Sequence, residues 1–255
     1  MDFYLGTHKP SWLSVLDVPA FVSRRRLVER RALPRARSPW SLDSGGFSEL
    51  TLFGDWRTSP AEYVADVRRF REEVGNLRWA AIQDWMCEPF MLAKTGLTVA
   101  DHQRRTTDNY AELLDRAPEL PWTPVLQGWN VGQYLDHADD YERRGLPLRD
   151  RVVGLGSVCR RQSSKSGLAI VRHVSVATGL RLHGFGVKTT GLRWMAPFLE
   201  SADSMAWSYR ARRAGQQDGC AHVQCSNCLR FALRWYHEVR ALIRKAIQQL
   251  GLVPA

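Results

Sequence analysis

Two aspartates in this 255-residue sequence stand in stretches that could bind and cleave a ligand. Asp43 ends the stretch WSLD and is followed by SGGF, in which two glycines without side chains precede Phe47. Such a stretch lets a flat ring approach the backbone behind the carboxylate. Asp203 lies far along the chain, in SADSMAWS. An aspartate carboxylate can act as a nucleophile or as a general acid and base, whereas the alternative interpretation makes both residues turn or helix-capping aspartates.

Four more candidate residues share with these aspartates a position at the end of a predicted strand. The six are Asp43, Asp84, Gln127, Gly154, His183 and Asp203, and each belongs to a different strand. In a parallel (β/α)8 barrel, chemistry takes place at the C-terminal ends of the strands. The positions therefore favour one shared site, although structural turns also favour aspartate and glycine.

Short β-rich runs alternate with longer helix-like stretches along the chain. Three of these stretches, 59–75, 98–118 and 130–145, show helix start or stop signals. The eight predicted strands are 2–7, 19–23, 40–43, 78–84, 122–128, 151–157, 180–186 and 201–207. This alternation predicts an α/β fold, a (β/α)8 TIM-like barrel. The first two connections between strands look irregular, because the stretch after the first strand is too short for a full helix.

The composition is that of a folded, basic protein. Hydrophobic residues make up 44% of the chain, and the formal net charge of +10 favours a polyanionic partner, either nucleic acid or a membrane surface. No apolar run reaches about 18 residues, so we expect no membrane span. The N-terminus lacks signal-peptide features, so we expect a cytoplasmic location, in a bacterium or in the host cell of a phage. Five cysteines, an odd number, argue against a disulfide framework.

Three of the five cysteines crowd into the stretch CAHVQCSNC near the C-terminus. With its histidine, the stretch offers three thiolates and one imidazole, a common closed ligand set for a structural Zn²⁺ ion. The predicted ligands are Cys220, His222, Cys225 and Cys228. His237 is the alternative fourth ligand, but it would lie about 13 Å from Cys228 along a helix. We therefore predict a catalytic barrel over 1–209 and a zinc-binding loop with a terminal helix over 210–255.

The chain also carries six motifs in a fixed order ahead of the cysteine-rich loop. They are LDSGGF, QDWMCEPF, PVLQGW, VGLGSV, LHGFGVKT and SADSMAWS. Together they resemble the queuine/archaeosine-type guanine transglycosylases and, most closely, the DpdA branch that acts on DNA. The resemblance implies a pentosyltransferase in which Asp203 is the nucleophile that holds the sugar covalently. It makes Asp43 the general acid/base that exchanges a proton with the base. His222 departs from the cysteine usual at its place in this family.

The same resemblance implies a pocket for the purine. Asp84 accepts hydrogen bonds from N1–H and N2–H2 of guanine, while the Gln127 amide and the Gly154 N–H donate to O6. Phe47 and His183 cover the two faces of the ring. The alternative interpretation of Gln127 is a buried amide that caps a strand end. The base-binding set also contains Leu155, Gly184 and Cys87, the last of which could equally be a small apolar filler.

Basic residues gather in two stretches and after one of the motifs. The densest run is SRRRLVERRALPRARS over 23–38, for which a solvated surface is an equally good interpretation. Nucleic-acid backbone contacts are predicted next to the proposed reaction centre and after the strand at 151–157, because phosphates have to be neutralised there. The residues concerned are Arg160, Arg161, Arg210, Arg212 and Arg213.

These inferences predict a DNA-guanine transglycosylase that inserts a 7-deazaguanine such as preQ0. Its partners are DNA with a flipped guanine, single-stranded or locally opened, the free base, and any helper proteins that open the duplex; no membrane is involved. DNA is favoured by the resemblance, and the short chain leaves less room for insertions that embrace a folded tRNA. The alternatives are a tRNA-guanine transglycosylase and a non-catalytic nucleic-acid-binding barrel, against which the presence of both aspartates argues.

Overall fold

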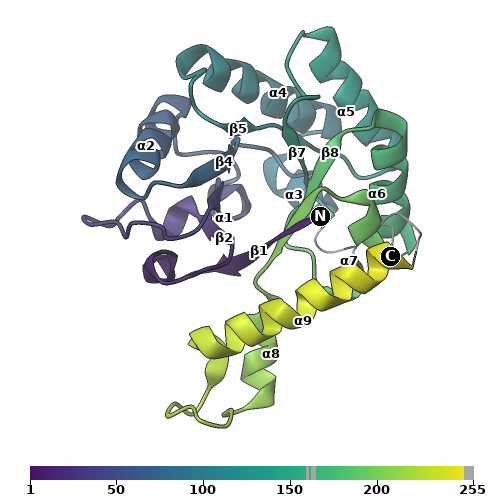
Figure 1. Cartoon of the computed structure of the whole chain (residues 1–255). Helices are drawn as coiled ribbons and strands as arrows, with labels where there is room; N and C mark the ends of the chain where they lie inside the picture. The colour runs from purple at the N-terminus through teal and green to yellow at the C-terminus, as the bar shows by residue number, and fades with distance from the viewer. Residues whose placement is uncertain (159–160, 162–164, 250–255) are drawn as a thin grey trace.

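The computed structural model describes residues 1–158, 161 and 165–249. Within this part of the chain, nine parallel strands form one sheet that curls into a nearly closed barrel surrounded by helices (Figure 1). The strand order is β5-β4-β3-β2-β1-β9-β8-β7-β6. The strands are β1 (Asp2–Thr7), β2 (Ala20–Ser23), β3 (Trp40–Asp43), β4 (Leu77–Ala81), β5 (Trp122–Thr123), β6 (Val125–Leu126), β7 (Val152–Leu155), β8 (Arg181–Gly184) and β9 (Ser201–Ser204).

The predicted α/β barrel is confirmed, and a ninth strand arises because the predicted fifth strand is divided. Pro124 separates β5 from β6 and has no N–H to give to the sheet. β5 pairs with β4 and β6 pairs with β7, so the stretch 122–126 joins the two ends of the sheet. Several strands end earlier than predicted, since β4 stops at Ala81 and β9 at Ser204. The residues beyond these ends leave the sheet and form loops at one end of the barrel.

Three of the helices begin with a side-chain cap that the sequence supplies. The Ser59 hydroxyl accepts from the Glu62 N–H at 3.3 Å, and the Glu62 carboxylate accepts from the Ser59 N–H at 2.8 Å. Thr98 and Asp101 cap the next predicted helix in the same way. The α-helices are α1 (Gly46–Phe53), α2 (Pro60–Glu73), α3 (Pro89–Thr95), α4 (Val99–Arg116), α5 (Val131–Arg143), α6 (Lys165–Thr178), α7 (Thr189–Met195), α8 (Ala206–Ala214) and α9 (Leu229–Gln248). The 3-10 helices are η1 (Pro10–Ser14), η2 (Arg24–Arg26), η3 (Ala196–Phe198) and η4 (Cys225–Asn227), and η1 and η2 are the irregular connections expected after the first two strands.

The C-terminal segment packs against the first strand. Phe3 on β1 contacts the rings of Trp235 and Tyr236 on α9, the long yellow helix of Figure 1, at centroid distances of 5.9 and 5.7 Å. Buried Trp207 on α8 donates a hydrogen bond to the Gly6 carbonyl at 2.8 Å. α8 runs without a break across positions 209 and 210, where we expected the two parts of the chain to meet. Among the described helices, none is long and apolar enough to span a bilayer.

Candidate active site

A cavity of about 910 Å³ lies at the C-terminal ends of the strands. Its volume is near the upper end of the range for small-molecule sites, about 300–1,000 Å³. Five of the predicted site residues line it: Asp43, Phe47, Asp84, Gln127 and Asp203. Because all the strands are parallel, their C-terminal ends meet at one edge of the barrel and bring together residues that are far apart in sequence.

Asp43 is the last residue of β3 and is half-buried in the cavity wall. The Ser23 hydroxyl and the Gly45 N–H form hydrogen bonds with its carboxyl group. Burial raises the pKa of Asp43, and the negative charge of Asp203 adds to the rise, while these two hydrogen bonds oppose it. A carboxyl group with a raised pKa holds a proton that it can donate to a departing base.

Asp203 lies on β9 and is 6% exposed. Its Oδ1 accepts a hydrogen bond from the Gly186 N–H at 2.8 Å. Nε2 of His183 lies 3.4 Å from the same oxygen, and Nδ1 of His183 lies 2.8 Å from the Ser201 hydroxyl. These contacts fix the Asp203 carboxylate in one orientation on the cavity wall.

Asp84 and Gln127 form one hydrogen-bonded unit on the cavity wall. Nε2 of Gln127 donates to Oδ2 of Asp84 at 2.5 Å, and Oε1 of Gln127 lies 2.7 Å from the Ser157 hydroxyl. A Cβ on Gly156 would overlap the Gln127 side chain, so only glycine leaves room for this arrangement. Burial raises the pKa of Asp84 to about 7, with further contributions from the charges of Asp43 and Glu88 and an opposing one from Gln127.

Two residues that sequence reasoning missed hold this unit from behind. Ser157 follows Gly156 and has a φ of 55°, an uncommon conformation for a residue other than glycine. Its hydroxyl accepts from the Cys87 N–H at 2.8 Å and has one proton to donate, either to Gln127 or to Glu88 at 2.9 Å. Glu88 is 2% exposed. Both lie within motifs quoted above, but no local pattern distinguishes them from their neighbours.

His183 is placed differently from our expectation. Its ring is fully buried and packs edge-on against Trp79 and Phe185, with ring centroids 4.8 and 4.9 Å away. It therefore lies behind the cavity wall, where it cannot cover an open face of a base. Phe185 lines the cavity in its place, and Phe21 contributes a second ring. The exposed Phe47 does lie on the wall, at the start of α1.

Four other predicted base-binding residues also lie behind the wall. The Gly154 N–H donates to the Pro124 carbonyl at 2.8 Å within the sheet, so it is already used and cannot serve O6 as expected. Leu155 and Gly184 are buried and do not line the cavity. Cys87 is fully buried, and burial raises the pKa of its thiol, which agrees with the apolar-filler interpretation.

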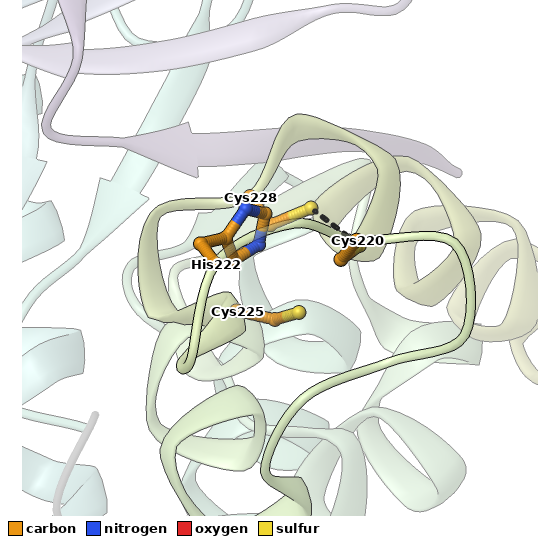
Figure 2. Close-up of side chains that lie close together, drawn as sticks. All are labelled: Cys220, His222, Cys225 and Cys228. Carbon is orange, nitrogen blue, oxygen red and sulfur yellow. Dashed lines mark hydrogen bonds between the residues drawn. The ribbon is translucent and has the colours of Figure 1, made fainter.

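The cysteine-rich loop between α8 and α9 brings four predicted metal ligands together, as Figure 2 shows. The ligand atoms of Cys220, His222, Cys225 and Cys228 all lie within 4.8 Å of one another. The Sγ atoms of Cys220 and Cys228 are 3.7 Å apart. Two thiolates bound to one tetrahedral zinc at about 2.3 Å would lie about 3.8 Å apart, so the donor set fits that ion. His237 lies on α9 outside the cluster.

One family model matches nearly the whole length of the chain. A family model described as "DpdA: DeoxyPurine in DNA protein A" matches residues 1–251. The chain belongs to the DpdA family. Membership implies a role in DNA modification.

Other comparisons add little to the DpdA assignment. No curated protein matches the chain. Among solved structures, the carboxyl transferase domain of Rhizobium etli pyruvate carboxylase matches 95% of this chain and 48% of its own chain, at 14% identity and a TM-score of 0.38. The same domain with pyruvate matches 96% and 48%, at 13% identity and a TM-score of 0.37. The chain thus spans about half the length of these structures, and a similarity this low carries no inference about activity.

In this DpdA-family protein, the described arginines predicted to contact the DNA backbone do not line the cavity. Arg210 pairs with Glu238 at 2.8 Å, and the Arg213 guanidinium lies over the Tyr209 ring at 4.5 Å. Neither they nor the exposed Arg212 line the cavity. Arg161 stacks over the Trp129 ring at 4.2 Å, and Arg160 lies outside the described residues.

The four predicted metal ligands lie in the loop that connects α8 to α9 and contacts the cavity wall. Loss of the metal is therefore expected to destabilise the protein. Ser208 on α8 donates to the Ser226 carbonyl at 2.8 Å, and His8 on the cavity wall contacts Asn227 at 2.5 Å. We predict that Cys228→Ser lowers the Tm by about 5–15 °C and abolishes bound zinc, measured by thermal unfolding and elemental analysis. His237→Ala is the matched control and should retain both. Zinc loss in the control with retention in Cys228→Ser would reverse the ligand assignment.

Proposed function

We propose that this DpdA-family protein exchanges guanine in DNA for a 7-deazaguanine base such as preQ0, through a covalent bond between Asp203 and the sugar. One observation carries the proposal: two carboxylates and the hydrogen-bonded Asp84–Gln127 pair line a single cavity. Asp43 and Asp203 supply the chemistry of base exchange, and the Asp84–Gln127 pair matches the polar edge of guanine.

The exchange takes two displacements at C1′ of the deoxyribose. The Asp203 carboxylate attacks C1′, the bond from C1′ to N9 breaks, and its electron pair leaves with guanine, which receives a proton from Asp43. The incoming base then gives its N9 proton to the Asp43 carboxylate and attacks C1′ from the side that guanine left. The bond between C1′ and Asp203 breaks, and the carboxylate is restored. The raised pKa of Asp43 supports the role of proton donor in the first step.

His183 acts in this scheme on the nucleophile rather than on the base. Its Nε2 lies 3.4 Å from Oδ1 of Asp203, and the contact of Nδ1 with Ser201 orients the ring. With the Gly186 N–H, it aims the carboxylate at the sugar. Phe21, Phe47 and Phe185 line the cavity, and a base in this scheme stacks on rings of this wall.

Guanine is recognised by its Watson–Crick edge. The Asp84 carboxylate accepts from N1–H and N2–H2, and the Gln127 amide, which carries two N–H donors, gives one to Asp84 and the other to O6. Adenine presents an acceptor at N1 and a donor at position 6, so it leaves both protein groups unpaired. Such mismatches reject a ligand by a large factor.

Base binding is expected to depend on pH through Asp84. Because burial raises the pKa of Asp84 to about 7, the free protein holds this carboxyl protonated at lower pH, where it cannot accept both donors of guanine. We predict that the affinity for free guanine falls about tenfold per pH unit below about 7 and is level above it. Calorimetric titrations from pH 5.5 to 8.5 measure this. An affinity that does not change across this range would assign the recognition of guanine to other groups.

The cysteine-rich loop holds a Zn²⁺ ion with a structural role. Its four protein ligands leave no open position for substrate, which is typical of structural sites. A bound ion would hold this loop, whose Ser226 carbonyl accepts from Ser208, against α8, the helix that directly follows the strand of the nucleophile.

The proposal is tested by mass spectrometry of nucleosides from the DNA and tRNA of cells that express this chain and are supplied with preQ0. The expected result is a 7-deazaguanine deoxynucleoside in DNA, absent from cells that express Asp203→Ala. A deazaguanosine in tRNA alone would favour the tRNA-guanine transglycosylase. A folded, zinc-loaded protein that binds DNA but modifies neither polymer would be the non-catalytic barrel.

A further inference from the structure

The basic run 23–38 is divided by the fold into two parts with different surroundings. Its first part forms η2, directly after β2, and places Arg24, Arg25 and Arg26 on the cavity wall. Ser23, at the end of β2, is in register with Asp43 at the end of β3, so η2 begins beside the proposed acid/base. The arginines at 30, 31, 35 and 37 do not line the cavity.

The three arginines of η2 are not equivalent. Arg24 is 8% exposed and forms an ion pair with Asp66 on α2 at 2.7 Å, which anchors η2 and neutralises the charge of Arg24. Arg25 and Arg26 are exposed, and within the described residues neither forms an ion pair. They therefore present two charges that are available to a ligand.

Arg25 packs against Gly45, the second residue after Asp43. A Cβ on Gly45 would lie 3.1 Å from Cγ of Arg25, so the arginine stem packs closely over the glycine backbone. Gly45 also has a φ of 88°, which favours glycine. The glycine thus serves both the turn after Asp43 and the placement of Arg25.

The acidic side chains of the cavity require cations near them if a DNA strand is to bind there. Asp203, together with Asp43 and Asp84 whenever these are ionised, makes its interior acidic, and that interior then repels a polyanion. A nucleotide whose C1′ lies at Asp203 carries phosphates on both sides of its sugar, and the cavity of about 910 Å³ is larger than one base requires. Glu29, Glu49 and Glu88 line the same cavity and add to its acidic character.

We propose that Arg25 and Arg26 bind the phosphodiester groups that flank the extrahelical guanine nucleotide of the DNA substrate. This inference rests on the proposed function and adds the site that holds the backbone. Exposed guanidinium groups of this kind bind phosphate through paired N–H donors. The two arginines offset the repulsion between the acidic cavity and the DNA.

The test compares two double variants that remove the same net charge from the same run. Arg25→Ala/Arg26→Ala alters the cavity wall, and Arg30→Ala/Arg31→Ala is the matched control. The probe is a fluorescent single-stranded DNA oligonucleotide with one guanine, and the Kd is measured by anisotropy over a range of salt concentrations. Calorimetry with free guanine measures the base pocket in the same proteins.

Arg25→Ala/Arg26→Ala is expected to raise the Kd for the oligonucleotide about tenfold at 0.1 M salt. It should also reduce the magnitude of the slope of the logarithm of the association constant against the logarithm of the salt concentration by about 1.4. The control should stay within about twofold, and guanine affinity should be unchanged in both. Equal losses in the two variants would mean a general charge effect and would overturn the proposal, as would no loss in either. If arginine-dependent DNA binding is found but the wild type exchanges no base, then the proposed function fails and this site stands.

Discussion

Asp203→Ala is expected to lower the rate of base exchange by at least about 10⁴-fold, because Asp203 is the proposed nucleophile that forms the covalent bond to C1′. The measurement is the release of labelled guanine from DNA, together with the trapping of a denaturation-resistant complex between protein and DNA. Both should be lost in the variant. DNA binding should remain, since the anchoring side chains of η2 and of the Asp84–Gln127 pair are untouched.

Two further variants separate nucleophilic attack from positioning. Asp203→Asn keeps an oxygen for the Gly186 N–H but removes the charge, and it should be as inactive as the alanine variant. Asp108→Ala removes an exposed aspartate on α4 that pairs with Arg144, and it should be fully active. If Asp203→Asn still forms the covalent complex, the nucleophile lies elsewhere.

Asp84→Asn is expected to lower kcat/KM for exchange of guanine by about 10³-fold or more, because the asparagine amide presents a donor where guanine also has donors. Xanthine has an acceptor at position 2 in place of the amino group, so it should gain affinity in the variant. The measurement is competition between free guanine and free xanthine for the pocket. Asp108→Asn is the control, and unchanged selectivity in Asp84→Asn would remove Asp84 from base recognition.

The same substitution should stabilise the fold at alkaline pH. Because burial raises the pKa of Asp84 to about 7, folding favours its protonated form. The contribution of protonated Asp84 to the free energy of unfolding is fully present below the ordinary pKa of an aspartate, about 4. It is lost as the pH rises through about 7. The Tm of Asp84→Asn should therefore exceed that of the wild type at pH 8, and the difference should close toward pH 4. A variant that is less stable at pH 8 would show that the carboxylate is stabilised by its neighbours.

Local sequence determined the elements of this protein. The strands, the capped helices and the short connections after the first two strands can be read from residue patterns, because caps and turns depend on neighbours within a few residues. The metal cluster could also be predicted, since its four ligands lie within one short loop. Asp43, Asp84, Gln127 and Asp203 could be assigned to one site because parallel strands end at the same edge.

Only the tertiary structure decided how deep each side chain lies and what it contacts. His183 lies on a strand end like Asp203, yet it is buried behind the wall among Trp79 and Phe185, because packing across the barrel sets that depth. The Gly154 N–H donates to the Pro124 carbonyl, and no local sequence pattern predicts this hydrogen bond. The basic run looks uniform in sequence, and the fold alone directs Arg25 and Arg26 to the cavity. The physical reason is that burial, pairing and charge partners depend on residues distant in sequence, and these are brought together when the barrel closes.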